Sequence, residues 1–116
     1  MTPKALHDFL LSLPATTHAV QWGDDHVYKV GGKMFAVTGV ENAVCRISFK
    51  AGPDSFDILT RADGIVPAPY LARALWVQVQ KPRALSDREM KAYLTRAHGI
   101  VAAGLTKKAR TQLGLA

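Results

Sequence analysis

The residues able to perform nucleophilic or metal chemistry are few, and they are widely separated along the chain. The single cysteine, Cys45, lies in the middle of a predicted strand, on the side that alternation directs toward the core, where a cysteine usually serves as a small buried hydrophobic residue. The four histidines fall on different predicted elements, without a His-x-x-x-His spacing: His7, His18, His26 and His98. Only the fold could assemble them into a metal site, so we predict no reactive thiol and no bound metal.

Two short polar motifs have ordinary structural explanations. Asp24-Asp25-His26 is the densest local group of metal-ligand side chains, but it stands at a strand-to-strand turn, where aspartates are expected. Gly31-Gly32-Lys33 lacks the four-residue spacer, the Lys-Ser/Thr ending and the following helix of a phosphate-binding P-loop. It is typical of a tight hairpin turn, although a glycine tip can also approach a nucleic-acid backbone closely. The sequence therefore predicts no catalytic residue and no cofactor.

Basic side chains are concentrated in the last third of the chain. The 116 residues carry a net charge of +6. Residues 1–72 hold 6 basic and 7 acidic side chains, whereas residues 73–116 hold 9 basic and 2 acidic ones, a balance of +7. If these side chains share one face, they would attract an anionic partner. An ordinary solvated surface explains the same excess.

Hydrophobic spacing and capping residues predict three helices that would position these groups. Thr2-Pro3 is typical of a helix start, and apolar residues then recur at helical spacing until Pro14 ends the segment. A short helix is predicted over 55–62, closed by Asp63-Gly64. Ser86 to Glu89 forms a capping box, and the helix that follows is expected to run to about Gly104.

Alternating apolar residues between turn signals predict about five strands. Those strands are expected over 16–22, 26–30, 33–38, 43–50 and 75–80, with short turns at Gly23-Asp24-Asp25, Gly31-Gly32 and Glu41-Asn42. Residues 65–73 contain two prolines and are expected to form a connector. The order α-β-β-β-β-α-β-α predicts an α+β fold, a single domain over 1–116 with one antiparallel sheet packed on helices on one face.

Alternation also assigns the two faces of this sheet. Cys45, Ile47 and Phe49 on one strand, and Leu75, Val77 and Val79 on another, are expected to face the core. The opposite face would then carry Arg46, Ser48 and Lys50 beside Trp76, Gln78 and Gln80. This mixture of cations, amides and an indole suits a binding surface, unless the connector covers Trp76 or its indole turns into the core.

Two longer segments resemble a known family. The stretches Val30-Gly31-Gly32-Lys33-Met34-Phe35-Ala36 and Gly64-Ile65-Val66-Pro67-Ala68-Pro69-Tyr70-Leu71, the latter leading into Trp76-Val77, are similar to the MmcQ/YjbR family. The resemblance spans nearly the whole chain, but Ala97-His98 departs from the Ser-Tyr pair that is more frequent in members. It implies a frataxin-like (CyaY-like) fold and double-wing DNA binding, with no catalytic motif. Iron binding is not expected, because the first helix contains only Asp8 as an acidic residue.

The resemblance and the charge pattern together predict a non-enzymatic, cytoplasmic protein that binds duplex DNA, mainly through phosphate contacts. The expected nucleic-acid-binding residues lie on the sheet face and the hairpin: Lys29, Lys33, Arg46, Lys50, Arg73, Trp76, Gln78, Lys81 and Arg83. No apolar run is long enough for a membrane span. The main alternative is a module that binds a small ligand or a protein between Trp76, Tyr70 and the hairpin, and an enzyme of unidentified type is the third.

Overall fold

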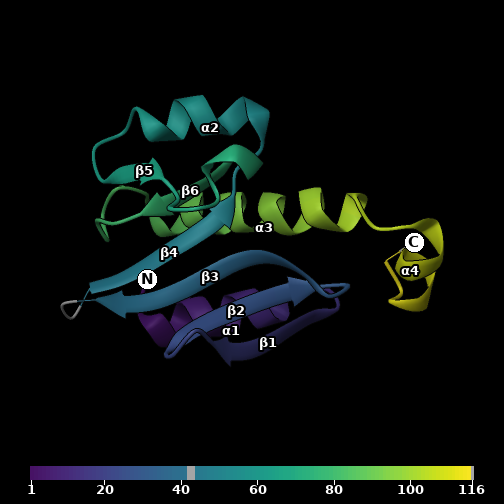
Figure 1. The fold of residues 1–116 in the computed structure, drawn as a ribbon. Helices are drawn as coiled ribbons and strands as arrows, with labels where there is room; N and C mark the ends of the chain where they lie inside the picture. Colours follow the sequence, from purple (N-terminus) through teal and green to yellow (C-terminus); the bar gives the residue numbers. More distant parts are fainter. Residues whose placement is uncertain (42–43, 116) are drawn as a thin grey trace.

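A six-stranded antiparallel sheet forms the centre of the computed structural model, which describes residues 1–41 and 44–115, and side chains for 1–39 and 45–115 (Figure 1). The spatial order is β1-β2-β3-β4-β6-β5, so that β5 and β6 exchange places relative to the sequence. The strands are β1 (Thr16–Gln21), β2 (Asp25–Val30), β3 (Lys33–Glu41), β4 (Val44–Lys50), β5 (Ile65–Pro67) and β6 (Trp76–Val79). The α+β class is confirmed.

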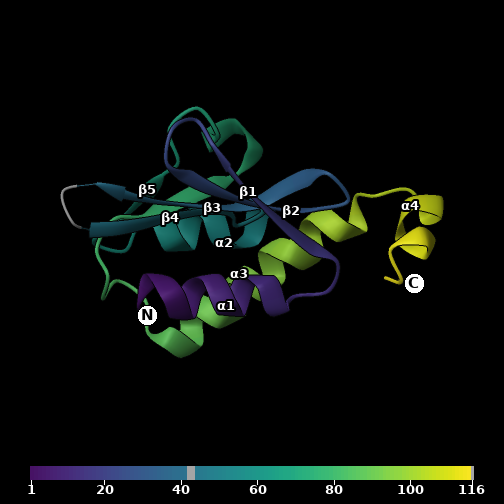
Figure 2. The ribbon, with the colours of Figure 1, turned by 90° about the horizontal axis from the view of Figure 1, so that it is seen from below.

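The helices leave one face of the sheet open. They are α1 (Pro3–Ser12), α2 (Pro53–Thr60), α3 (Asp87–Ala103) and α4 (Lys107–Gln112), with a short 3-10 turn, η1, at Ala72–Ala74. α1 and α3 lie beneath the sheet, while the β1–β2 turn and the connector that contains η1 rise from its opposite face (Figure 2). Among the described residues, none of the helices has the length and apolar character that crossing a bilayer requires.

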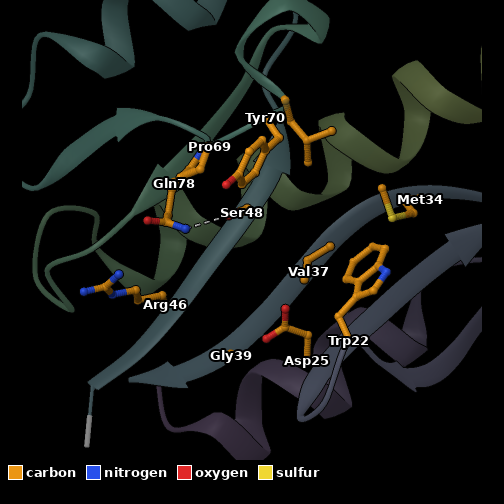
Figure 3. Close-up of a pocket in the computed structure, with 11 residues that line it drawn as sticks. Trp22, Asp25, Met34, Val37, Gly39, Arg46, Ser48, Pro69, Tyr70 and Gln78 are labelled. Atoms are coloured by element: carbon orange, nitrogen blue, oxygen red, sulfur yellow. Dashed lines mark hydrogen bonds between the residues drawn. The ribbon is translucent and has the colours of Figure 1, made fainter. Parts of the chain in front are cut away.

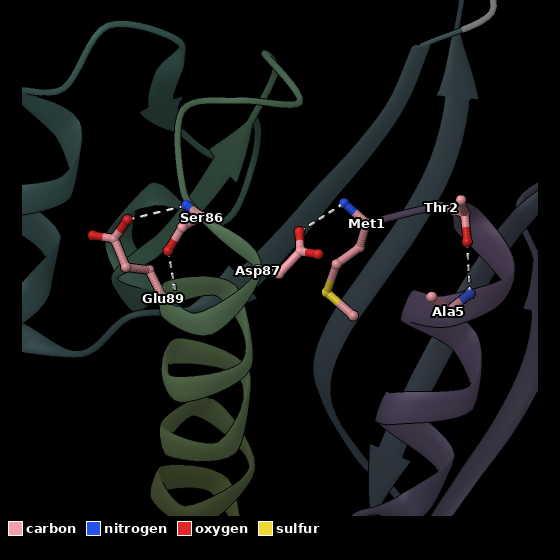
Figure 4. A network of polar contacts seen from close by, with 6 residues as sticks. All are labelled: Met1, Thr2, Ala5, Ser86, Asp87 and Glu89. Atoms are coloured by element: carbon pink, nitrogen blue, oxygen red, sulfur yellow. Dashed lines mark hydrogen bonds and ion pairs between the residues drawn. The ribbon is translucent and has the colours of Figure 1, made fainter.

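The predicted helix starts are confirmed by their hydrogen bonds. The amide of Ala5 donates to the Thr2 hydroxyl at 3.1 Å, with proline in the first turn (Figure 4). Ser86 and Glu89 exchange both bonds of a capping box, at 3.0 and 3.1 Å. The amino group of Met1 lies 3.0 Å from a carboxylate oxygen of Asp87, which links the beginnings of α1 and α3.

The core lies between the sheet and the helices, in the register that alternation predicts. Phe49 and Val77 face α3 and are completely buried together with Leu10, Phe35 and Leu94. Cys45 is half-buried against this cluster. Each fully buried aliphatic or aromatic side chain contributes roughly 1.5–3 kcal/mol to folding, so this register is strongly specified.

The structure corrects two details of the predicted sheet. Residues 65–67 form an additional edge strand, β5, although Pro67 favours a connector; an edge tolerates proline because one side of the strand has no hydrogen-bonded neighbour. Leu75 does not point into the core from a strand. It precedes β6 in a left-handed conformation, with φ of 64°, and is only half-buried. The turn expected at Glu41-Asn42 and the first residue expected in the fourth strand, Ala43, lie outside the described residues at positions 42 and 43.

The predicted hairpin at Gly31-Gly32 is present, and its tip packs against the C-terminal region. Both glycines have positive φ, 59° and 78°, as a two-residue hairpin turn requires. A Cβ on Gly31 would lie 2.6 Å from the side chain of Leu105, whereas one on Gly32 would meet nothing. The tip that could have approached a nucleic-acid backbone is therefore partly used to pack the fold.

Candidate ligand-binding groove

Two segments rise from the open face of the sheet (Figure 2). Residues of both segments line one groove. One segment is the turn between β1 and β2, residues 22–24, and the other is the connector over 68–75. Each segment carries an exposed aromatic side chain. Trp22 is 64% exposed and Tyr70 is fully exposed. Figure 3 shows these two rings on opposite sides of the groove.

Both aromatic residues have a backbone conformation that is costly for their residue type. The φ angles of Trp22 and Tyr70 are 50° and 66°, in the left-handed region. For residues other than glycine this region costs roughly 1–2 kcal/mol. Large exposed rings on such backbone are unfavourable both sterically and for solubility, which is typical of positions retained for binding rather than for stability.

Between these rims, the floor of the groove consists of outward side chains from the central strands. The cavity measures about 480 Å³ and is lined by Trp22, Asp25, Met34, Val37, Gly39, Arg46, Ser48, Pro69, Tyr70, Leu71 and Gln78. Met34 and Val37 supply an apolar strip along β3, and the polar groups come from β2, β4 and β6. An apolar strip with a few convergent polar groups is typical of a ligand site.

Gly39 separates the two charged groups of the floor. It pairs with Arg46 in the register of β3 and β4, and a Cβ at this position would lie 2.7 Å from a carboxylate oxygen of Asp25. Because Gly39 has no side chain, the Asp25 carboxylate can lie over β3. The Arg46 side chain lies on the opposite side of Gly39 (Figure 3). The floor therefore offers one anionic and one cationic group.

Hydrogen bonds align the amides at the β6 side of the groove. The side-chain amide of Gln78 donates to the Ser48 hydroxyl at 3.3 Å, and the amide of Gln80 donates to the Gln78 carbonyl oxygen at 3.0 Å. All three side chains are half-buried. Gln78 and Ser48 retain further donor or acceptor capacity, so they could bond to a ligand without leaving this arrangement.

The structure brings some of the predicted nucleic-acid-binding residues together and separates others. Arg46 and Gln78 line the groove, and Lys50 shares their face of β4. The outward side chains of β2 include Lys29, opposite Met34. Arg73 is exposed on the connector. Lys33, Lys81 and Arg83 lie outside the groove lining, and Lys81 forms an ion pair with Asp63 at 2.6 Å.

Trp76 is not part of the exposed surface. Its side chain is 4% exposed, although the pairing of β6 with β4 places the residue on the open face of the sheet. The connector crosses here, because Ala68 donates a backbone hydrogen bond to Trp76 and Trp76 donates one to Leu71. Of the two alternatives for Trp76, the covered position is the one observed, so its indole is not available for stacking.

Most basic side chains of the last third lie away from the open face. Arg88, Lys91 and Arg96 belong to α3, which lies beneath the sheet, and α4 extends beyond the end of α3 (Figures 1 and 2). Arg96 also lies 3.4 Å from the carboxylate of Asp54. The net charge of +7 over residues 73–116 is therefore not concentrated on one continuous basic face.

Two features of the structure were missed from sequence. Trp22 was assigned only as the end of a strand, although an aromatic residue directly before Gly23-Asp24 stands at a turn and is thereby exposed. The fold also brings His7, His18 and His26 together, one ring nitrogen from each within 4.8 Å of the others. The spacing of the histidines along the sequence did not indicate this cluster, because it depends on the pairing of β1 with β2 and on the position of α1 against that face.

The chain belongs to the YjbR family, whose model matches residues 11–100. A solved structure from Deinococcus radiodurans, protein DR2400 with a DUF419 domain, is similar with a TM-score of 0.88 and 27% identity, covering 99% of this chain and 89% of its own. A protein from Pseudomonas syringae shares the fold with a TM-score of 0.71 and 19% identity, over 87% of this chain and 99% of its own. None of the curated proteins matches.

Proposed function

We propose that this member of the YjbR family is a non-enzymatic protein that binds nucleic acid in the groove of the open sheet face, with unpaired bases stacked on Trp22 and Tyr70. The observation that carries the proposal is the pair of exposed aromatic rings on strained backbone, on opposite sides of one groove. Base stacking on an aromatic side chain contributes roughly 1–3 kcal/mol per base and tolerates any sequence.

Cations on the open face and on one rim of the groove would hold the phosphates. Arg46 and Lys50 lie on the open face of β4, Lys29 lies on the same face of β2, and Arg73 lies on the connector that forms one rim. Basic side chains beside stacking platforms are the usual composition of a surface that binds single strands. Gln78 and Ser48 would bond to base edges or to phosphate oxygens.

A single strand suits this face better than a duplex does. The groove lies between the exposed rings of Trp22 and Tyr70, so that separate bases could enter it while a duplex would rest on its rims. The cations of α3 lie on the other side of the sheet and could not add to duplex binding from the same direction. We therefore change the partner predicted from sequence, duplex DNA, to an unpaired strand.

The two tryptophans allow a direct measurement. Because Trp22 is exposed and Trp76 is buried, stacking of a base would quench the emission of Trp22 selectively. A ten-nucleotide thymidine strand is titrated against the protein at several salt concentrations. If two to four of the cations on the open face and its rim (Lys29, Arg46, Lys50 and Arg73) neutralise phosphates, the slope of log affinity against log salt should be about −1.4 to −2.8. Each contact contributes roughly −0.7 for single strands.

Variants on the two faces test the location of binding. Tyr70→Ala and Arg46→Gln should each weaken binding about ten-fold, because they remove one stacked base or one phosphate contact. Arg88→Gln is the matched control, since Arg88 is an exposed arginine at the start of α3. Equal affinity in all three variants, or no quenching by the strand at ~50 mM salt, would contradict the proposal.

A second candidate is a small planar anion, and the volume of the groove favours it. About 480 Å³ lies within the range of sites for single small molecules. The same titration with a mononucleotide distinguishes the two candidates. A mononucleotide that binds as tightly as the ten-nucleotide strand, with little salt dependence, would support the small ligand instead.

A further inference from the structure

Three histidines meet on the helix-covered side of the sheet, on the opposite side from the groove. His7 belongs to α1, His18 to β1 and His26 to β2. His18 and His26 are diagonal neighbours across the β1–β2 ladder, in which His18 pairs with Tyr28 and Val20 with His26. The His7 ring contacts that of His18 edge-on, with 4.9 Å between ring centroids.

The three rings bring their nitrogen atoms close to one another. One ring nitrogen from each lies within 4.8 Å of the other two. His18 Nε2 and His26 Nδ1 are 2.7 Å apart and share one hydrogen bond. In a tetrahedral zinc site, two nitrogens bound at about 2.05 Å lie about 3.3 Å apart. Small rotations of the half-buried side chains would therefore bring all three nitrogens to bonding distance of one ion.

A buried phenol fixes the third ring. His7 Nδ1 lies 2.7 Å from the hydroxyl oxygen of Tyr28, which is 1% exposed and also hydrogen-bonded to Thr38. Histidines that bind metals usually hold their other ring nitrogen by such a partner, which sets the tautomer and the orientation of the ring.

We propose that His7, His18 and His26 form a binding site for a divalent transition metal ion, with Zn²⁺ as the ion that fits best. Imidazole nitrogens suit zinc and its neighbours, whereas calcium and magnesium require oxygen ligands. Three histidines leave the fourth tetrahedral position to water or to an exogenous ligand. The proposal departs from the expectation of no metal, which depended on the spacing of the histidines along the sequence.

Metal binding can be tested on the full chain after treatment with a chelator. Co²⁺ is titrated first, because its visible absorption bands report a four-coordinate site, and Zn²⁺ is then added to displace it. We expect one Co²⁺ per chain, displaced by one equivalent of Zn²⁺. Binding should also raise the melting temperature, since an ion that binds only the folded state stabilises it by mass action.

Variants on one strand supply matched controls. His18→Gln should weaken Co²⁺ binding at least ten-fold, while Thr17→Gln, at the exposed neighbouring position of β1, should leave it unchanged. Tyr28→Phe should weaken binding by about ten-fold, the usual effect of removing a partner that orients a ligand. His26→Cys should retain binding, because a thiolate is also a zinc ligand.

The folded state of each variant is checked by circular dichroism, and His7→Gln replaces His18→Gln if the latter does not fold. A folded wild-type protein that binds neither ion at millimolar concentration would overturn the proposal. The same conclusion follows if His18→Gln and Thr17→Gln bind Co²⁺ equally well, because the ion would then occupy another place.

Discussion

At Trp22 and Tyr70, the residue type that suits the proposed binding role lowers the stability of the fold. Each residue holds a left-handed backbone conformation, and each exposes most of an aromatic ring to solvent. The folded chain gains little packing from the fully exposed ring of Tyr70, yet bears the steric cost of its backbone. Selection for stability alone would favour glycine at position 70.

Tyr70→Gly should therefore stabilise the protein and weaken binding at the same time. Glycine removes the steric cost of a positive φ, and the gain is reduced by its larger entropy in the unfolded chain. We expect a net increase of about 0.5–1 kcal/mol in the free energy of unfolding in urea. Affinity for the ten-nucleotide strand should fall about ten-fold. A loss of stability would mean that the Tyr70 ring packs against the connector in solution.

Cys45 illustrates a group that its surroundings make unreactive. The thiol is half-buried on β4, and burial raises its pKa above the ordinary value. Because the thiolate is the nucleophile, the reactive fraction at pH 8 is smaller in the folded protein than in the unfolded chain. Native Cys45 should react with a disulfide reagent at least about ten-fold more slowly than it does in urea. Equal rates would show that the beginning of β4 opens readily.

At the scale of elements, the β2–β3 hairpin connects the sheet to the segment between α3 and α4. Gly31 meets the side chain of Leu105, which is 8% exposed, whereas Gly32 faces open space. The two glycines have similar backbone conformations, with φ of 59° and 78°, but different surroundings. Comparison of the two positions therefore separates the effect of backbone conformation from the effect of packing.

Gly31→Ala should destabilise the protein more than Gly32→Ala. Both variants bear a left-handed alanine, at a cost of about 1 kcal/mol, and only the first adds a contact at 2.6 Å that Leu105 must relieve, for about 1 kcal/mol more. Urea unfolding measures both values. In the background of Leu105→Ala the difference should disappear, and a difference that persists would locate its cause in the turn itself.

Most elements could be predicted because their signals are local. Capping residues and hydrophobic spacing located α1 and α3, and alternation assigned the faces of β4 correctly. β5 was not predicted, because its three residues are too few for a pattern and Pro67 argues against a strand. Its existence depends on pairing with β6, which is a tertiary interaction.

The candidate sites were harder to predict than the elements. Arg46 and Gln78 were assigned to the right face by alternation, but the burial of Trp76 depends on the path of residues 68–75, which no periodic pattern specifies. The histidine cluster joins two neighbouring residues of the β1–β2 ladder, His18 and His26, to a residue of α1. That contact depends on how a helix is oriented on the sheet, and sequence spacing does not encode this orientation.

At the scale of the whole molecule, net charge and local charge have different consequences. The protein carries +6, yet the open face has both signs near the groove, because Asp25 and Arg46 both line it. Salt at 0.1 M screens charges more than about 10 Å apart, so the cations of α3 and α4 contribute little across the sheet. Affinity should then depend on the groove cations rather than on the total charge.

Charge reversal at matched positions tests this distinction. The pair Arg88→Glu and Lys107→Glu changes the net charge by −4 on the exposed surfaces of α3 and α4, and should leave affinity for the strand within two-fold at 0.1 M salt. Lys29→Glu and Lys50→Glu change it by the same amount on the open face, and should reduce affinity more than ten-fold. Equal losses from both pairs would mean that total charge attracts the strand.

Strand β2 serves both proposed sites with alternate residues. Asp25 points into the groove, and the next residue, His26, belongs to the histidine cluster on the other face. Removal of one residue from this strand would reverse the faces of everything beyond it and would disrupt both sites in a single step. Insertions and deletions should thus be confined to the turns at either end of β2. Point substitutions, in contrast, could change one proposed site and leave the other intact, so the two proposed sites could diverge independently in relatives that keep the length of this strand.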